Sequence, residues 1–222
     1  MRKPAWLAEV IVQSIAIVIS ILLALWVDQW KQRSAAHELE IVSVSNFLKE
    51  VHQNEARLDD ILPYHKGVRS MLARLATTNA VKTQADFENA VGVDGLRPPS
   101  LLQTAWQTAV ATGALTKLDY ETVSALSLTY TLQDRFREDG RTGFQTVLQA
   151  SNFGPGGAQI AVRTADNYLR EVVTNEEDLR ATYAQAEQVL RAKLKTLDAS
   201  IPPDSASAPP PQMPDSTATS RP

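Results

Sequence analysis

The chain has 222 residues, enough for one domain, with 22 basic and 25 acidic side chains and a net charge of −3. Nucleic-acid-binding proteins usually carry a basic surface that neutralises phosphates, so this mildly acidic balance argues against a nucleic-acid partner. The absence of cysteine excludes disulfide bonds, thiolate catalysis and cysteine-ligated zinc sites.

The N-terminal segment predicts a transmembrane helix. Residues 10–27 contain no charged side chain, and about 20 apolar residues are needed to cross a hydrocarbon core of roughly 30 Å. Trp6 and Trp26 bracket the run at a spacing that suits the two interfacial regions of a bilayer. A cleavable signal peptide is the alternative, but bulky and charged residues follow the run where small residues would mark cleavage. We therefore expect residues 1–30 to be an uncleaved anchor in the lipid bilayer.

The orientation of this anchor is weakly encoded. Arg2 and Lys3 precede the run, while Lys31 and Arg33 follow it, so the positive-inside rule is nearly balanced. The terminal amine favours placing the N-terminus in the cytoplasm. We therefore expect a single-pass membrane protein with its C-terminal domain outside the cytoplasm.

One face of the predicted span carries small and polar residues, namely Gln13, Ala16, Ser20 and Ala24. Small residues spaced by four let two membrane helices approach closely, and a glutamine can form a hydrogen bond across such a contact. The pattern predicts a helix–helix contact within the membrane, with either a second copy of the chain or another membrane protein. The alternative is that small residues are simply common in membrane helices.

The span is predicted to continue directly into a helical stalk. No glycine or proline occurs between Pro4 and Pro63, and apolar residues recur at helical spacing after the membrane. We assign residues 31–62 to this stalk. Residues 63–200 are then expected to form a helical bundle that packs with the stalk.

Within the bundle region, helix-boundary signals mark several elements. A short helix is expected around residues 68–75, another starting at Thr83, and a loop over residues 92–99. Ser100 and Gln103 form a capping-box pattern for the next helix, and Gly113 is placed to end it.

The C-terminal half of the bundle continues this pattern. Asp119 is the expected N-cap of a helix running toward Gly140. After a turn-rich break at residues 152–157, a last helical stretch has heptad-like apolar spacing, typical of packing within one bundle; an intermolecular coiled coil is the alternative. A capping-box pattern at Thr174 and Glu177 leaves open whether this stretch is one helix or two. Residues 201–222 hold seven of the twelve prolines and are expected to be disordered.

No motif in the sequence indicates catalysis, a cofactor or a metal. The three histidines, His37, His52 and His65, do not have metal-ligand spacing. His52 and Glu55 lie three residues apart, as ligands do in di-iron bundles, but a second such pair is missing. We therefore expect no catalytic, cofactor-binding or metal-ligating residues, and no enzymatic activity.

Four short stretches carry a family resemblance. The first lies at the membrane exit, ILLALWVDQW at residues 21–30. The others are WQTA at 106–109, TGAL at 112–115 and LDYE at 118–121. In these stretches the chain resembles a family of uncharacterised bacterial single-pass membrane proteins with an N-terminal span and a helical domain. The resemblance implies the domain order described above and a place in the bacterial inner membrane with the C-terminal domain in the periplasm, but no activity and no catalytic residues.

The sequence favours a membrane-anchored interaction or structural module of the bacterial envelope. One alternative is a sensory or ligand-binding helical domain that acts through a partner membrane protein, for which a pocket lined by Trp106, Tyr120 or Tyr130 is the expected mark. The other alternative is an envelope enzyme whose site is scattered through the sequence.

Overall fold

The computed structural model describes residues 5–78, 80–91, 96–151 and 156–199, and these residues contain helices and no strand. The all-α fold class is therefore confirmed. In chain order the helices are α1 (Ala5–Thr78), α2 (Gln84–Val91), α3 (Thr104–Thr112), the 3-10 helix η2 (Ala114–Lys117), α4 (Tyr120–Ser151) and α5 (Gly157–Ala199).

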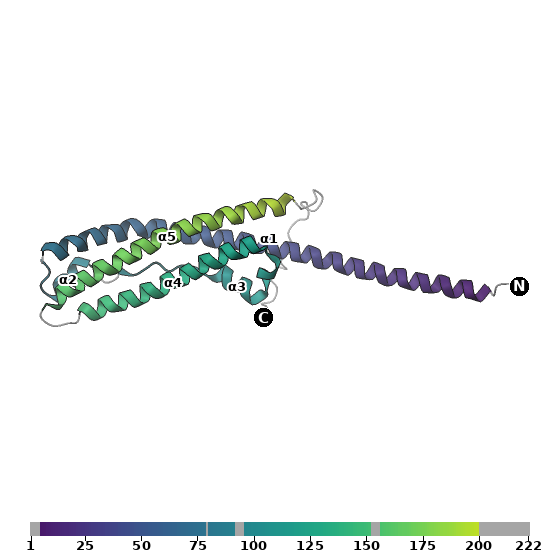
Figure 1. Ribbon diagram of the computed structural model, residues 1–222, viewed down its shortest axis with the longest axis horizontal. Coiled ribbons are helices and arrows are strands. Elements are labelled where there is room, and N and C mark those ends of the chain that lie inside the picture. Colours follow the sequence, from purple (N-terminus) through teal and green to yellow (C-terminus); the bar gives the residue numbers. More distant parts are fainter. Residues whose placement is uncertain (1–4, 79, 92–95, 152–155, 200–222) are drawn as a thin grey trace, which may run out of the picture.

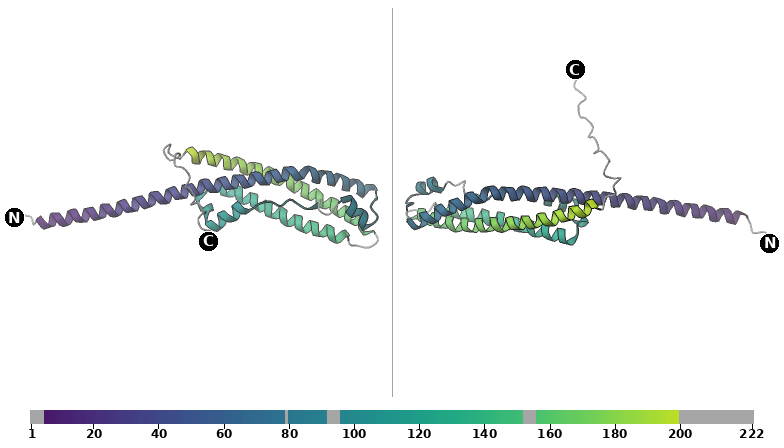
Figure 2. Two further views of the ribbon diagram at one scale, coloured as in Figure 1. Left: turned by 180° about the vertical axis from the view of Figure 1, so that it is seen from behind. Right: turned by 90° about the horizontal axis from the view of Figure 1, so that it is seen from above.

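Three long helices, α1, α4 and α5, run side by side and form an elongated bundle (Figures 1 and 2). Helix α5 packs along both α1 and α4, whereas α3 and η2 lie against α1 and α2 lies against α5. The N-terminal part of α1 projects well beyond the bundle (Figure 1). The bundle core is built from the apolar faces of all these elements.

The projecting part of α1 is the one segment among the described residues that is long and apolar enough to cross a membrane. Every side chain over residues 13–35 is exposed, including the apolar ones. From Ile41 onward the helix instead buries one stripe against the rest of the bundle. The predicted stalk over residues 31–62 is therefore exposed only at its start, and most of it is a bundle helix.

Helix α1 does not end at Pro63, where the sequence placed the boundary between stalk and bundle. It continues to Thr78, so the separate helix expected around residues 68–75 is the last part of α1. Proline lacks an N–H and costs an interior helical hydrogen bond. Pro63 is exposed, however, while the flanking Leu62 and His65 keep the buried stripe in register. Burial on one face therefore outweighs the local loss of a hydrogen bond.

Helix α4 reaches Gly140, toward which it was expected to run, and continues through it. It extends past Gly140 and Gly143 to Ser151. A β-carbon on Gly140 would lie 2.7 Å from the Pro98 side chain, and one on Gly143 would lie 2.4 Å from the Tyr168 ring. These two glycines therefore permit close approach of neighbouring segments instead of breaking the helix.

Three helix-boundary predictions are confirmed. Thr83 and Asp86 exchange hydrogen bonds at the start of α2, since each side chain accepts from the other residue's backbone N–H. Gly113 ends α3 in the left-handed conformation, with φ of 71°. The Asp119 carboxylate accepts a hydrogen bond from the Thr122 backbone N–H at 2.8 Å, as an N-cap of α4 should.

The predicted capping box at Ser100 and Gln103 is wrong. Helix α3 begins at Thr104, and residues 97–103 form no helix. Tertiary contacts override the local signal, because the Arg57 guanidinium donates to the Ser100 carbonyl and the Leu102 backbone is bonded to Asn54. A carboxylate from α1 takes over the N-terminal donor that a local cap would have satisfied.

Helix α5 is one helix of 43 residues, which resolves the choice left open at Thr174 and Glu177. The Thr174 hydroxyl donates to the Arg170 carbonyl one turn earlier and so does not cap a new helix. The predicted disordered tail and most of the predicted turn after α4 lie outside the described residues.

Candidate functional site

An extended segment, residues 97–103, lies beside α1 and α4 and belongs to no helix, so that helical hydrogen bonds cannot satisfy most of its backbone groups. Buried backbone groups require hydrogen bonds. The Asn54 side chain supplies two: its Oδ1 accepts from the Leu102 N–H at 2.7 Å, and its Nδ2 donates to the Leu102 carbonyl at 2.9 Å. Gln133 of α4 also donates to that carbonyl, at 2.8 Å. The two side chains thus hold the segment in place.

These contacts belong to a larger buried cluster, which we call the polar core: Glu50, Asn54, Tyr130, Gln133 and Tyr183. The Tyr183 hydroxyl of α5 donates to Gln133 of α4, and Asn54 of α1 also donates to Gln133. Every long helix of the bundle therefore contributes to one hydrogen-bonded network. Such a network fixes the relative register of the helices, because a slip would leave several buried groups unpaired.

Glu50 is a buried carboxylate of the polar core, and both of its oxygens accept hydrogen bonds from neutral groups. Its Oε2 accepts from the Ala105 N–H at 2.8 Å, in the first turn of α3, and its Oε1 accepts from the Tyr130 hydroxyl at 2.7 Å. The N-terminus of a helix favours a negative charge. Burial, followed by the hydrogen bond to Glu50, raises the pKa of Tyr130, so the phenol stays a donor.

Aromatic rings pack beside the polar core. Trp106 stacks on Tyr130 with ring centroids 5.1 Å apart, and Phe47 lies 6.4 Å from Trp106 and 6.2 Å from Tyr130. Trp106 and Tyr130 therefore hold α3 and α4 against α1, and they do not line the groove described next. Tyr120, the third aromatic expected to mark a ligand pocket, is exposed and lines a separate surface groove with Leu128.

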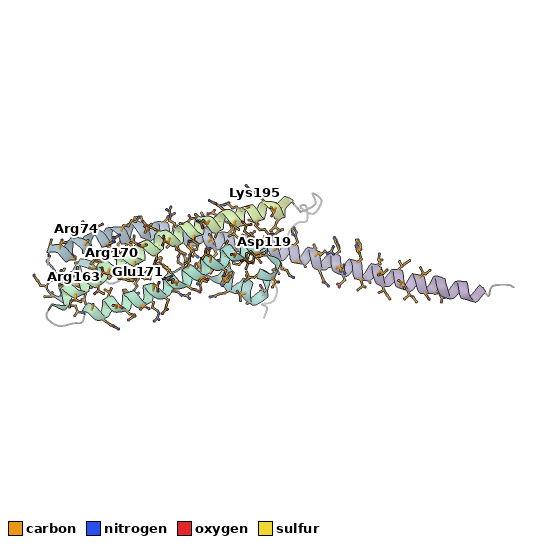
Figure 3. All side chains as sticks on the ribbon, viewed as in Figure 1. Arg74, Asp119, Arg163, Arg170, Glu171 and Lys195 are labelled. Carbon is orange, nitrogen blue, oxygen red and sulfur yellow. The ribbon has the colours of Figure 1, made fainter. Side chains whose placement is uncertain are left out.

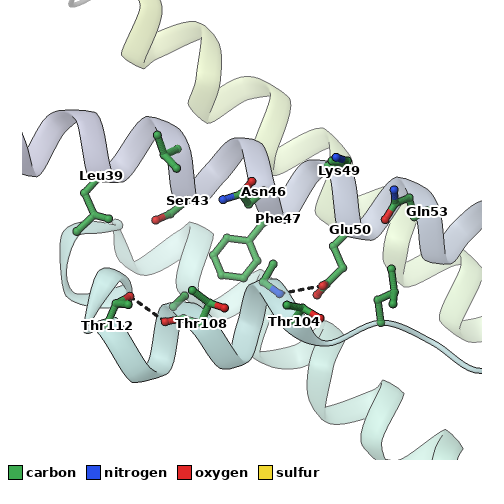
Figure 4. Close-up of a pocket in the computed structure, with 14 residues that line it drawn as sticks. Leu39, Ser43, Asn46, Phe47, Lys49, Glu50, Gln53, Thr104, Thr108 and Thr112 are labelled. Atoms are coloured by element: carbon green, nitrogen blue, oxygen red, sulfur yellow. Dashed lines mark hydrogen bonds between the residues drawn. The ribbon is translucent and has the colours of Figure 1, made fainter. Parts of the chain in front are cut away.

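A surface groove of about 470 Å³ lies between α1 and α3 (Figure 4). Its floor includes Phe47 and Glu50, and its rim includes the half-exposed Val42. The polar residues of its lining, besides Glu50, are Ser43, Asn46, Lys49, Gln53, Thr104, Thr108 and Thr112. A surface that combines apolar and polar side chains is typical of protein-binding surfaces.

The groove lies in the half of the bundle from which α1 projects. At 1.5 Å per residue, its first lining residue, Leu39, is about 14 Å along the helix from Trp30. In the same region, Lys193 of α5 contacts Glu40 of α1 at 2.7 Å and Asp119 at 2.9 Å. Asp119 and Lys195 mark this end of the bundle, while Arg74 and Arg163 lie at the opposite end (Figure 3).

The four residues predicted for a contact within the membrane, Gln13, Ala16, Ser20 and Ala24, are all exposed on the projecting part of α1. The Ser20 hydroxyl donates to the Ala16 carbonyl at 2.8 Å, which satisfies it within the helix. No described part of the chain covers this face. The predicted helix–helix contact therefore stays a prediction.

The structure adds a residue that sequence reasoning missed. His52 and Glu55 lie on one face of α1 as expected, and Glu187 of α5 lies beside them, with one potential ligand atom of each within 4.8 Å of the others. Only the packing of α1 against α5 brings Glu187 there, so no local pattern signals it.

The histidines separate into different environments. His65 is fully buried and its Nδ1 lies 2.8 Å from Glu176, which is also fully buried. His52 is exposed. His37 is half-buried and belongs neither to the His65–Glu176 pair nor to the group of His52, Glu55 and Glu187. A single spacing rule could not have distinguished these roles, because they depend on which face of α1 meets α5.

No family model, curated protein or solved structure matches this chain. The resemblance to an uncharacterised membrane-protein family therefore stays a prediction that rests on the short stretches quoted above.

Proposed function

We propose that the chain is a membrane-anchored interaction module of the bacterial envelope, held in the inner membrane with its bundle in the periplasm. The observation that supports this most is the continuity of α1. One helix is mostly apolar and uncovered over residues 13–27 and, further along, becomes a core helix of the bundle. A continuous helix transmits position and orientation, so the bundle is presented at a set height above the bilayer.

Two uncovered surfaces supply places for a partner. The first is the groove between α1 and α3, in the half of the bundle from which the span projects. The second is the small-residue face of the span, at Gln13, Ala16, Ser20 and Ala24. A partner membrane protein, or a second copy of the chain, can meet both surfaces at once, which raises the effective concentration of the second contact.

Crosslinking in native membranes tests the interaction. A photo-crosslinking residue at Val42, on the groove, is expected to give a discrete adduct with one partner or with a second copy. The same residue at Ser45, exposed on the same stretch of α1 but outside the groove, is the matched control and is expected to give none. A protein that stays monomeric in membranes and forms no adduct at Val42 would contradict the proposal.

The compartment is tested separately. A topology reporter fused to the C-terminus is expected to read out in the periplasm, because the positive charge before the span slightly exceeds that after it. A cytoplasmic readout would overturn the proposed periplasmic location of the bundle. The proposed interaction would still be decided by the crosslinking experiment.

A further inference from the structure

A histidine and two carboxylates from two helices meet on the side of α1 that faces α5. His52 and Glu55 are three residues apart on α1, a spacing that places two side chains next to each other on a helix surface. Glu187 reaches them from α5, so that a ligand atom from each residue lies within 4.8 Å of the other two. Three ligand atoms this close can bind one ion.

Charged side chains surround this cluster. The carboxylates of Glu55, Asp59 and Glu187 lie near the guanidinium groups of Arg180 and Arg191. Arg180 pairs with Asp59, and Arg191 donates to a single oxygen of Glu187, Oε1. The second oxygen of Glu187, Oε2, accepts neither of these hydrogen bonds from Arg191.

Carboxylate oxygens of Glu55 and Glu187 lie within 4.8 Å of each other, and two negative charges at this distance repel each other. The Glu187 side chain is only 18% exposed, so water screens this repulsion poorly. A bound cation would replace the repulsion with attraction to both carboxylates.

We propose that His52, Glu55 and Glu187 bind a divalent transition-metal ion that clamps α1 to α5. One imidazole nitrogen with two carboxylate oxygens suits Zn²⁺ and similar ions, whereas Mg²⁺ and Ca²⁺ prefer sites made of oxygen alone. Three protein ligands leave a coordination position for water or an external ligand. This assignment differs from the sequence-based expectation of no metal site, which lacked the third ligand.

The position of the site gives the ion a structural consequence. His52 and Glu55 alternate along α1 with Glu50 and Asn54 of the polar core, which bond to α3, α4 and the extended segment. An ion at the cluster would therefore fix the contact of the same stretch of α1 with α5. We expect the bundle to unfold at a higher temperature when the ion is bound.

Zn²⁺ titration of the full-length protein in nanodiscs, purified without a polyhistidine tag, tests the proposal. We expect one Zn²⁺ per chain by calorimetry and a rise in unfolding temperature. His52→Ala removes an exposed ligand, so the fold should persist while the affinity falls at least tenfold. Glu187→Gln should weaken binding similarly. His37→Ala removes a histidine of the same helix that lies outside the cluster. It should leave unchanged both the Zn²⁺ affinity and the rise in unfolding temperature that Zn²⁺ causes.

Other outcomes would overturn the assignment. Absence of stoichiometric Zn²⁺ binding would do so, as would binding that survives His52→Ala or disappears in His37→Ala. An equally tight response to Mg²⁺ would contradict a site that contains a nitrogen ligand. The visible absorption of bound Co²⁺ provides an independent check, because it should be present in the wild-type protein and absent in His52→Ala.

Discussion

Helix α1 consists of two parts that share one backbone but differ in their surroundings. Over residues 13–35 every side chain is exposed, and leucines such as Leu22 and Leu23 are 59% and 61% exposed. Beyond Ile41, apolar residues such as Val44 and Phe47 are fully buried, while charged residues fill the outer face. A helix that is apolar on all sides needs an apolar solvent, whereas a helix with one apolar stripe needs only a protein partner.

The two parts of α1 are therefore stabilised by different forces. The first part is expected to depend on lipid and to be insensitive to bundle packing. The second depends on buried contacts and on the hydrogen bonds of the polar core. Substitutions can therefore be chosen that damage one part and spare the other.

The largest effect is expected from a charge in the middle of the span. Ile19→Arg should disfavour membrane insertion by about 3.5 kcal/mol, because arginine at the centre of a membrane helix is strongly unfavourable and isoleucine is favourable. Carbonate extraction of membranes should then release part of the protein. Val42→Arg is the matched control, since Val42 is exposed on the bundle part of α1, and it should leave the protein in the membrane fraction.

A somewhat smaller effect is expected in the bundle from loss of the buried carboxylate. Glu50→Ala should lower the free energy of unfolding by about 3 kcal/mol, because two buried donors, the Ala105 N–H and the Tyr130 hydroxyl, lose their acceptor. Denaturant titration in detergent would measure this loss. Lys49→Ala, at an exposed neighbour, should change stability by less than about 0.5 kcal/mol. Similar losses for both variants would mean that the polar core is not formed as described.

Two glycines test packing within the bundle with opposite expected signs. Gly143→Ala should lower the free energy of unfolding by about 2 kcal/mol, because the new methyl group would collide with the Tyr168 ring. Gly67→Ala should raise it by about 0.5 kcal/mol, because nothing lies within 4 Å of that position in the helix. Thermal unfolding of the two variants would check both signs. If Gly143→Ala were neutral, α4 and α5 would not approach as closely as described.

The smallest effect concerns the end of the bundle from which the span projects. Hydrogen bonding to the Thr122 N–H is the main cause that lowers the pKa of Asp119 from 3.8 to about 2. Because the pKa is depressed in the folded state, the contribution to stability is present above pH 3.8 and is lost as the pH falls toward 2. Asp119→Asn should remove this part of the acid sensitivity. Unfolding temperature measured against pH for both proteins would isolate it, and parallel curves would contradict it.

Much of the fold could be predicted from the sequence because its signals are local. The apolar run, the Asp119 cap and the Gly113 terminus each depend on a few neighbouring residues, and the structure contains the corresponding helix elements. The errors arose where a local signal competed with tertiary contacts. Pro63 and Gly140 are helix breakers by local rules, but one faces solvent and the other faces Pro98.

The candidate sites were harder to predict because their residues are distant in the chain. Asn54 and Gln133 are ordinary polar residues until the segment at Leu102 is placed beside them. Glu187 becomes a potential metal ligand only when α5 packs against α1. One sequence signal could have pointed to the polar core. Polar residues, such as Glu50 and Asn54, occur on the predicted apolar face of the helix.

In the proposed arrangement one unbroken helix carries the bundle out of the bilayer, and the distance between two spin labels on α1 measures this continuity. The chain has no cysteine, so labels can be placed specifically at Leu23→Cys in the span and Ser45→Cys in the bundle. In nanodiscs, a continuous helix places the two α-carbons about 33 Å apart, and the distance distribution should be narrow. A broad distribution, or one centred well below this value, would show a break between the two parts of α1 and contradict the account.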